Sequence, residues 1–165
     1  MTGAATQEEK ARRDAALERL TLTSPYHRFI GVSFVRMGDE LTARLAYSEH
    51  LIGNPLIPAL HGGVTGALLE ITAIMQLAWD ELWRGMEAGG AEAAAIHAGR
   101  LPKLPKTIDL TIDYLRSGRP RDAYARATVQ KAGRRVANVR VEAWQDSRDR
   151  PIAAAHGHFL MQNAG

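Results

Sequence analysis

The chain has 165 residues and a mass of 18.0 kDa, which suits one compact domain with its own hydrophobic core. A composition of 45% hydrophobic and 24% charged residues is typical of a globular protein and excludes disordered and collagen-like chains. The sequence has no cysteine, so disulfides, thiol nucleophiles and thiolate metal sites are excluded, and we expect a cytoplasmic location. The net charge of +3 is a mild excess, and without a DNA-binding motif we expect no nucleic-acid partner.

Residues 1–24 are predicted to form a helical extension, and residues 25–165 a single domain. The start of the chain carries charges of both signs and no apolar run, which favours a short amphipathic helix over a secretory signal. Two strand-like runs follow at residues 29–36 and 41–47, and the glycine between them predicts a hairpin turn.

The longest weakly charged stretch runs from Leu51 to Trp79 and has the length of a membrane span. It contains Pro55, Pro58 and Glu70, which hydrocarbon disfavours, so we expect no membrane partner. From residue 64 to about residue 83 no proline occurs, and apolar residues fall on every side of a helical wheel. This pattern predicts one long helix that is surrounded by protein.

The segment from Gly85 to Pro105 contains several glycines and prolines and predicts a loop with one short helical turn. The clearest strand follows at residues 107–114, where apolar and polar side chains alternate. Its predicted apolar face is Ile108, Leu110, Ile112 and Tyr114, and its predicted opposite face is Thr107, Asp109, Thr111 and Asp113.

Three more strands are predicted at residues 123–130, 136–144 and 152–161. The links between them are too short for helical crossovers, so the strands after the helix are expected to form an antiparallel meander. Two strands, one long helix and four strands together predict an α+β fold in which a sheet curls around a single helix.

Glu70 stands inside the predicted buried helix, where an unpaired carboxylate is costly. The positions three and four residues away hold only glycine, alanine and isoleucine, so no cation is available at helical spacing. Glu70 therefore needs a partner from elsewhere in the fold, water or a substrate. A structural ion pair with an arginine of a strand or of a partner chain is the alternative.

His61, Gly62 and Gly63 immediately precede the predicted helix. Two glycines at a helix N-terminus leave amides open to a ligand and predict an oxyanion site. Glu70 follows Gly62 by eight residues, which is about 12 Å along a straight helix. Because one helix cannot present both groups to the same atom, we expect a homodimer whose sites combine the amide of one chain with the carboxylate of the other.

His61-Gly62-Gly63-Val64, five intervening residues and Glu70 resemble the signature of the hotdog-fold acyl-CoA thioesterases of the PaaI and Arthrobacter-type 4-hydroxybenzoyl-CoA thioesterase group. The segment from Thr107 to Arg116 is similar to the strand that follows the helix in that family. The resemblance covers about residues 28–161. It implies a hotdog fold, with an antiparallel sheet of five to six strands wrapped around one long central helix, and hydrolysis of an acyl-CoA thioester by a homodimer or a dimer of dimers.

On this resemblance, Glu70 would attack the thioester carbonyl or activate a water against it, and the Gly62 amide would polarise the carbonyl. His61 would orient the loop or hydrogen-bond near the thioester. Asn54 would serve as the Asn or Gln that the family carries upstream of the histidine. Thr107 stands where relatives carry a Ser or Thr from the partner chain, and it would hold the nucleophilic water.

Coenzyme A carries a pyrophosphate and a 3′-phosphate, so the resemblance also implies that basic side chains at the strand turns recognise it. Coenzyme A is then part of the substrate, and we expect no separate cofactor. The candidate residues for its binding are Gly63, Arg116, Arg119, Arg134 and Arg135.

Two other functions stay open at this point. One is a non-catalytic hotdog dimer that binds acyl-CoA. The other is a hotdog hydratase or dehydratase, because the Pro55 to Pro58 segment is similar to a motif of those enzymes, although Leu56 stands where they need a histidine. His156 and His158 alternate on the last predicted strand and could form half of a metal site, but no third ligand is evident, so we expect no metal.

Overall fold

The computed structural model describes residues 6–162. Helix α1 (Gln7–Thr21) begins with a capping box, in which the Thr6 side chain accepts from the amide of Glu9 and the Glu9 carboxylate accepts from the amide of Thr6. Residues 1–5 of the predicted N-terminal helix lie outside the described residues. Ala16, Leu17 and Leu20 of α1 are buried in the same hydrophobic core as the rest of the chain.

The predicted strand at residues 29–36 begins later than expected because a short helix, α2 (Pro25–Ile30), precedes it. Proline at the first helical position favours this turn, and Gly31 ends it with a φ of 81°. Strand β1 (Val32–Met37) then pairs with β2 (Glu40–Leu45) as an antiparallel hairpin. After β2, a short helical turn η1 (Glu49–Leu51) leads into a small hairpin of β3 (Ile52–Asn54) and β4 (Ala59–Leu60), which the sequence analysis did not predict.

The central helix α3 (Gly62–Ala88) is longer than predicted, and α4 (Gly90–His97) occupies much of the predicted loop. Gly85 accounts for the close packing of the second helix on the first. A Cβ at Gly85 would lie 2.5 Å from Cδ1 of Ile96, so this glycine allows α4 to pack closely on α3. The helices are separated at Gly89 and Gly90, whose φ values of 71° and 59° lie in the left-handed region.

The main sheet has six antiparallel strands in the order β1-β2-β6-β7-β8-β5, with β5 (Lys106–Tyr114), β6 (Ala123–Ala132), β7 (Val136–Trp144) and β8 (Ala153–Leu160). The predicted meander is correct from β6 to β8 but wrong for β5. Strand β2 already occupies one side of β6, with Ala43 opposite Ala125, and β7 occupies the other. Strand β5 therefore pairs with β8 at the edge of the sheet.

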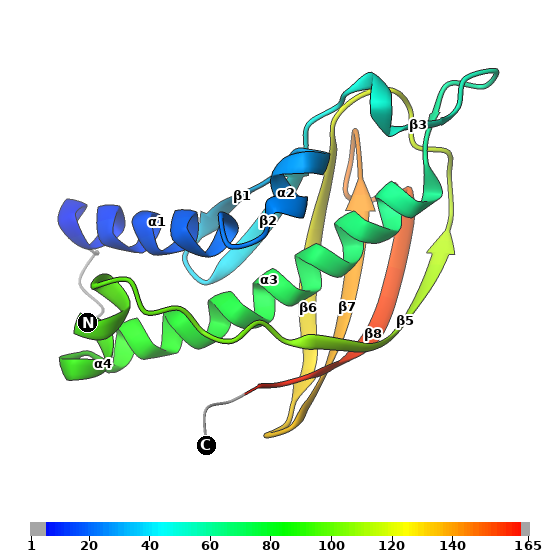
Figure 1. Ribbon diagram of the computed structural model, residues 1–165. Helices are drawn as coiled ribbons and strands as arrows, with labels where there is room; N and C mark the ends of the chain where they lie inside the picture. Colours follow the sequence, from blue (N-terminus) through cyan, green and yellow to red (C-terminus); the bar gives the residue numbers. More distant parts are fainter. Residues whose placement is uncertain (1–5, 163–165) are drawn as a thin grey trace.

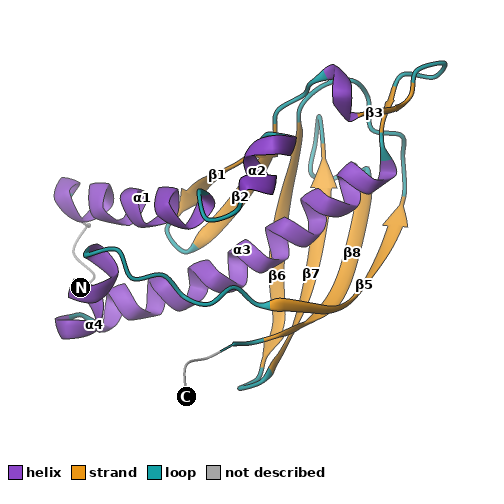
Figure 2. Ribbon diagram, in the orientation of Figure 1, coloured by secondary structure: helices purple, strands orange, loops and turns teal. Residues whose placement is uncertain are grey.

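The sheet curves around α3 on one side, and α1 and α4 cover the C-terminal half of that helix on the other (Figure 1, Figure 2). This arrangement confirms the predicted α+β hotdog fold. The largest fully buried side chains include Trp79 and Met75 of α3 and Phe159 of β8. Over residues 6–162, no helix combines the length and apolar character that crossing a bilayer requires.

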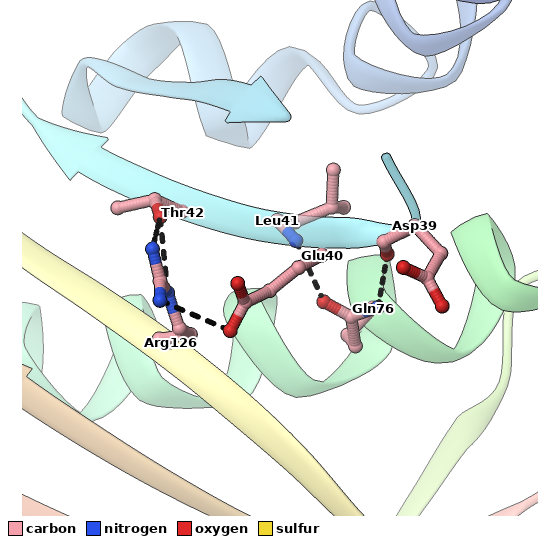
Figure 3. Close-up of polar contacts among 6 residues, drawn as sticks. All are labelled: Asp39, Glu40, Leu41, Thr42, Gln76 and Arg126. Atoms are coloured by element: carbon pink, nitrogen blue, oxygen red, sulfur yellow. Dashed lines mark hydrogen bonds and ion pairs between the residues drawn. The ribbon is translucent and has the colours of Figure 1, made fainter. Parts of the chain in front are cut away.

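Gln76 joins α3 to the turn between β1 and β2 (Figure 3). Its Oε1 accepts from the amide of Leu41 at 3.0 Å, and its Nε2 donates to the carbonyl of Asp39 at 2.9 Å. Nε2 also donates to Oδ1 of Asp80. Burial raises the pKa of Asp80, and this hydrogen bond opposes the shift. The buried amide thus satisfies backbone groups where the hairpin meets the helix.

A bulge in β5 changes which side chains face α3. Thr107 pairs with Phe159 and Asp109 with His158, so Ile108 is an extra residue. Asp109 accepts from the amide of His158 and lies 3.0 Å from its Nδ1, and the side-chain hydrogen bond lowers the pKa of Asp109. The bulge places Thr107 on the α3 side of the sheet, where it reaches Glu70, and this corrects the predicted alternation.

We expect the substitution Gly157→Ala to destabilise the protein by about 1–3 kcal/mol, because the added methyl group would overlap a backbone atom of β5 and the backbone would have to move. Gly157 pairs with Leu110 next to the bulge, and a Cβ there would be 2.4 Å from the carbonyl oxygen of Asp109. Urea unfolding measures the effect, with Ala154→Ser on the same strand as a control that should stay within about 0.5 kcal/mol of wild type. Equal stability of Gly157→Ala and wild type would show that the bulge does not depend on this close approach.

Candidate active site

The N-terminus of α3 carries the first group of candidate residues. His61 is the N-cap, and its Nδ1 accepts from the amide of Gly63 at 2.9 Å, which leaves the ring proton of neutral His61 on Nε2. The Gly63 amide is therefore engaged in the cap and does not present a free donor to a coenzyme A phosphate. The Gly62 amide donates to no acceptor within residues 6–162. Gly62 is thus the amide of this helix start that is open to a ligand.

Tyr114 of β5 holds this helix start against the sheet. Its hydroxyl donates to the carbonyl of Gly62 at 2.8 Å. A cavity of about 410 Å³ opens beside the pair, and Thr65 and Arg116 also line it. The sequence analysis placed Tyr114 on the correct face of its strand but gave it no role, since only the packing of α3 on β5 shows that it touches Gly62.

Glu70 and Thr107 form the second group. The Thr107 hydroxyl donates to Oε1 of Glu70 at 2.5 Å, and both side chains are half-buried. The resemblance implied that Thr107 would act from a partner chain, but this contact with Glu70 lies within one chain. Glu70 takes part in no ion pair over residues 6–162, which leaves no support there for the alternative of a structural salt bridge.

A stripe along the N-terminal half of α3 is only partly covered by the chain. Gly63, Ala67, Glu70 and Ile74 follow one another at spacings of four, three and four residues, which places them on one face of the helix. Gly63 is exposed and the others are half-buried, whereas Leu77, the next residue on this face, is only 2% exposed. Glu70 therefore lies on an open face made otherwise of small and apolar residues.

Within one chain, the free amide and the carboxylate lie too far apart to act together. Gly62 and Glu70 are eight residues apart in a continuous helix, which corresponds to about 12 Å. Gly62 lies at the Tyr114 end of β5, and Glu70 lies at the Thr107 end. The two groups therefore cannot reach the same atom from within one chain.

The predicted arginines fall into two groups at opposite ends of the sheet. Arg116 and Arg119 line a cavity of about 420 Å³ that adjoins the one at Gly62 and shares Arg116 with it. Arg134 and Arg135 belong to the turn between β6 and β7, at the other end of the strands. The structure therefore does not bring the four arginines together in one chain.

Two further arginines, Arg121 and Arg150, line the same cavity as Arg116 and Arg119. Asp146 is the acidic residue in this lining, and it pairs with Arg121 at 2.5 Å. The sequence signal was the grouping of arginines at turns, but only the sheet topology shows which turns share one end. Excess positive charge beside Gly62 suits an anionic group.

Asn54 lies at the end of β3 and turns its side chain into its own hairpin. Its Oδ1 accepts from the amides of Leu56 and Ile57 at 3.1 and 3.4 Å. This is an Asx turn that orders the hairpin loop. The side-chain oxygen of Asn54 is thus engaged within the hairpin, and its predicted role as the upstream amide of the family stays a prediction.

His156 and His158 lie on β8, and His158 is engaged with Asp109 and, at 3.4 Å, with Asn138. Across residues 6–162, potential metal ligands do not gather in groups of three or more. The two histidines of β8 thus have no further potential ligands grouped with them among these residues.

A curled antiparallel sheet around one long helix, with a free amide at the start of the helix and a carboxylate eight residues later, defines a hotdog protein of the thioesterase type. The chain is 33% identical over 120 residues to the medium/long-chain acyl-CoA thioesterase YigI of Escherichia coli K12, covering 72% of this chain and 74% of the relative. The family model described as Thioesterase superfamily matches residues 84–152. The chain belongs to the thioesterase superfamily, and the predicted class of enzyme, a hydrolase of thioesters, is confirmed.

Solved structures agree with this assignment. A protein of Chromobacterium violaceum is 32% identical with a TM-score of 0.63, and the match covers 97% of this chain and 100% of that one. A Bacillus halodurans protein crystallised with CoA has a TM-score of 0.62 at 19% identity, with both chains covered completely, and shows the same fold. Membership of the PaaI-type group within the superfamily stays a prediction.

We expect His61→Ala to lower the free energy of unfolding by about 1 kcal/mol, because it removes the side-chain acceptor of the α3 N-cap. His61→Asn offers an amide oxygen to the same Gly63 amide and should retain most of the stability. Chemical unfolding of the three proteins measures the difference. If the alanine and asparagine variants are equally stable, the cap hydrogen bond does not stabilise the helix.

Proposed function

We propose that the protein hydrolyses an acyl-CoA thioester, with Glu70 as nucleophile or general base and the Gly62 amide as the donor that polarises the thioester carbonyl. Two contacts at opposite ends of one edge strand support this most directly: Tyr114 with Gly62, and Thr107 with Glu70. The relative YigI is named as an acyl-CoA thioesterase, and the Bacillus halodurans structure contains CoA. Both support acyl-CoA as the substrate class.

The site is completed by a second copy of the chain. Strand β5 pairs with β8 on one side and has no neighbour on the other in the described sheet, and Ile108, Tyr114 and Leu115 near this edge are about half exposed. A long edge strand of this kind is suited to pairing with another strand. A two-fold axis through the middle of β5 makes the new pair antiparallel, which brings the Tyr114 end of one chain to the Thr107 end of the other.

In such a homodimer, Gly62 of one protomer approaches the partner subunit's Glu70. These positions support the expected sharing of each site between two chains. A dimer of dimers is compatible with the same pairing, and the number of sites per dimer is two by symmetry.

The chemistry needs an attack on the thioester carbonyl and release of a thiolate. In the general-base route, Glu70 takes a proton from water as the water oxygen bonds to the carbonyl carbon, and the carbon–sulfur bond then breaks to leave the acid and the CoA thiolate. In the nucleophilic route, a Glu70 oxygen forms a mixed anhydride that water hydrolyses. In both, negative charge develops on the carbonyl oxygen, which the Gly62 amide and the N-terminal end of α3 stabilise.

Thr107 prepares Glu70 for either route. Because its hydroxyl donates to Oε1, the carboxylate is held in one orientation with Oε2 available for water or the carbonyl carbon. His61 contributes by holding the first turn of α3 rather than by contacting the thioester through Nδ1, which is occupied by the Gly63 amide.

Arginines beside the Gly62 cavity are the proposed site for the phosphates of coenzyme A. Arg116 and Arg119 were expected on the resemblance, and Arg121 and Arg150 complete the lining. Guanidinium groups bind phosphate oxygens in a bidentate manner. Arg134 and Arg135 lie at the opposite end of their own sheet, so a role in CoA binding would require the partner's copy of that turn.

The hydratase alternative lacks the histidine that its chemistry needs, because Leu56 stands at that position. Release of CoA thiol distinguishes an enzyme from a protein that only binds acyl-CoA.

We expect Glu70→Gln to lower kcat for the best acyl-CoA at least about 100-fold, because the amide can neither accept the proton nor attack the carbonyl. Release of free CoA thiol from a panel of acyl-CoAs measures turnover. Wild-type protein that binds acyl-CoA without releasing thiol would support the binding protein instead. Full activity of Glu70→Gln would remove Glu70 from the mechanism.

Gly62→Pro removes the proposed hydrogen-bond donor, the Gly62 amide, with little change of structure. Gly62 is the first residue of α3 and follows an extended His61, where proline is well accommodated, but proline has no amide hydrogen. We expect a decrease in kcat of about 100-fold to 1000-fold with unchanged helix content by circular dichroism. Gly62→Ala, which keeps the amide and meets Tyr114 at an ordinary 3.5 Å, is the matched control and should retain activity.

A further inference from the structure

The loop of the β3–β4 hairpin is an apolar tip that nothing in the described chain covers. Leu56 is 93% exposed and Ile57 is 69% exposed, and Pro55 and Pro58 flank them. The hairpin extends beyond the start of α3 (Figure 1). Isolated exposed apolar residues are ordinary, but four consecutive apolar residues at a projecting tip are not.

The hairpin is built to hold this tip in one place. The Asn54 side chain accepts from the amides of both tip residues, and the two prolines restrict the backbone. The base of the hairpin is tight, because a Cβ at Gly53 would lie 2.7 Å from the ring of His61. The amide of His61 also donates to the carbonyl of Leu51 at 2.8 Å. The tip is therefore fixed relative to the helix start that carries the Gly62 amide.

The position of the hairpin determines what it can reach. Its base joins α3 at the Tyr114 end of β5, and the amide of Leu60 donates to the carbonyl of Gly118 just beyond that strand. In the antiparallel pairing of two β5 strands, this end lies next to the Thr107 end of the partner. There the open stripe of α3 presents Ala67, Glu70 and Ile74.

We propose that Leu56 and Ile57 of one protomer form the outer apolar wall of the acyl site at the partner subunit's Glu70, and that they set the preference for long acyl chains. The surface that covers the tip is thus a second copy of this chain together with the acyl group bound there. The inference rests on the proposed function, and it adds residues that determine specificity. An acyl chain leaving the thioester carbon would lie between the partner's stripe and this tip, since both surfaces are apolar and neither is covered by its own chain.

The double variant Leu56→Gln/Ile57→Gln tests the wall through the dependence of kcat/KM on chain length. With saturated acyl-CoAs from short to long, we expect the value for the longest chains to fall about 10-fold or more and that for the shortest to stay within about twofold, since each buried methylene contributes about fourfold. Met37→Gln, an exposed apolar residue on the opposite edge strand β1, is the matched surface control.

Hybrid dimers test whether the tip acts on the other chain. A dimer of one Glu70→Gln chain and one Leu56→Gln/Ile57→Gln chain contains one site with an intact tip and an intact glutamate only if the two come from different chains. Co-expression in equal amounts should then restore about a quarter of the wild-type long-chain activity, because half of the dimers are hybrids with one complete site of two. Absence of restoration, with hybrid dimers confirmed by affinity tags, would overturn the proposal.

Sedimentation of the double variant completes the test. A dimer with a selective loss of long-chain turnover supports the acyl wall. An equal loss for all chain lengths, or a monomeric variant, would show that the tip is only a dimer contact and would refute the proposal. Failure of the proposed function is seen separately, as undiminished turnover by Glu70→Gln.

Discussion

The fold depends on covering a helix that is apolar on nearly all sides. Helix α3 cannot remain in water, and one sheet can cover only one side of it, so the six strands curve around it while α1 and α4 pack on its C-terminal half. The buried Gln76 amide fixes the middle of the helix to the β1–β2 turn, and Gly85 lets α4 approach closely. The N-terminal half of α3 keeps one partly open stripe, and Glu70 lies on it.

The proposed mechanism uses the part of helix α3 that the chain leaves partly uncovered. At its start, His61 engages the Gly63 amide and leaves the Gly62 amide available. Farther along, Thr107 orients Glu70, and it can do so only because a bulge in β5 shifts the alternation of the strand. Gly157 and Asp109 stabilise that bulge, so residues outside the site determine the geometry of the carboxylate.

Strand β5 links folding to function because it contacts both halves of the site. One end holds Gly62 through Tyr114, the other holds Glu70 through Thr107, and the free edge between them is suited to a two-fold partner. A single antiparallel pairing would therefore assemble two sites at once. The hairpin tip at Leu56 and Ile57 lies at the same end as Gly62, so in the proposed dimer this exposed apolar loop would face the partner subunit.

The long apolar helix, the alternating strands and the unusual position of Glu70 could be predicted from local patterns, because periodicity and the cost of a buried charge act over short stretches of chain. His61 and Gly62 at the helix start were predictable for the same reason, since glycine and a capping side chain act over a few residues. Four features came only from the packing of distant segments: the place of β5 at the sheet edge, the bulge that turns Thr107 to Glu70, the engagement of Gly63 in the cap and the separation of Arg134 and Arg135 from Arg116 and Arg119. These features depend on which strands become neighbours and on close approaches such as that at Gly157, and a local pattern carries no information about contacts between distant parts of the chain.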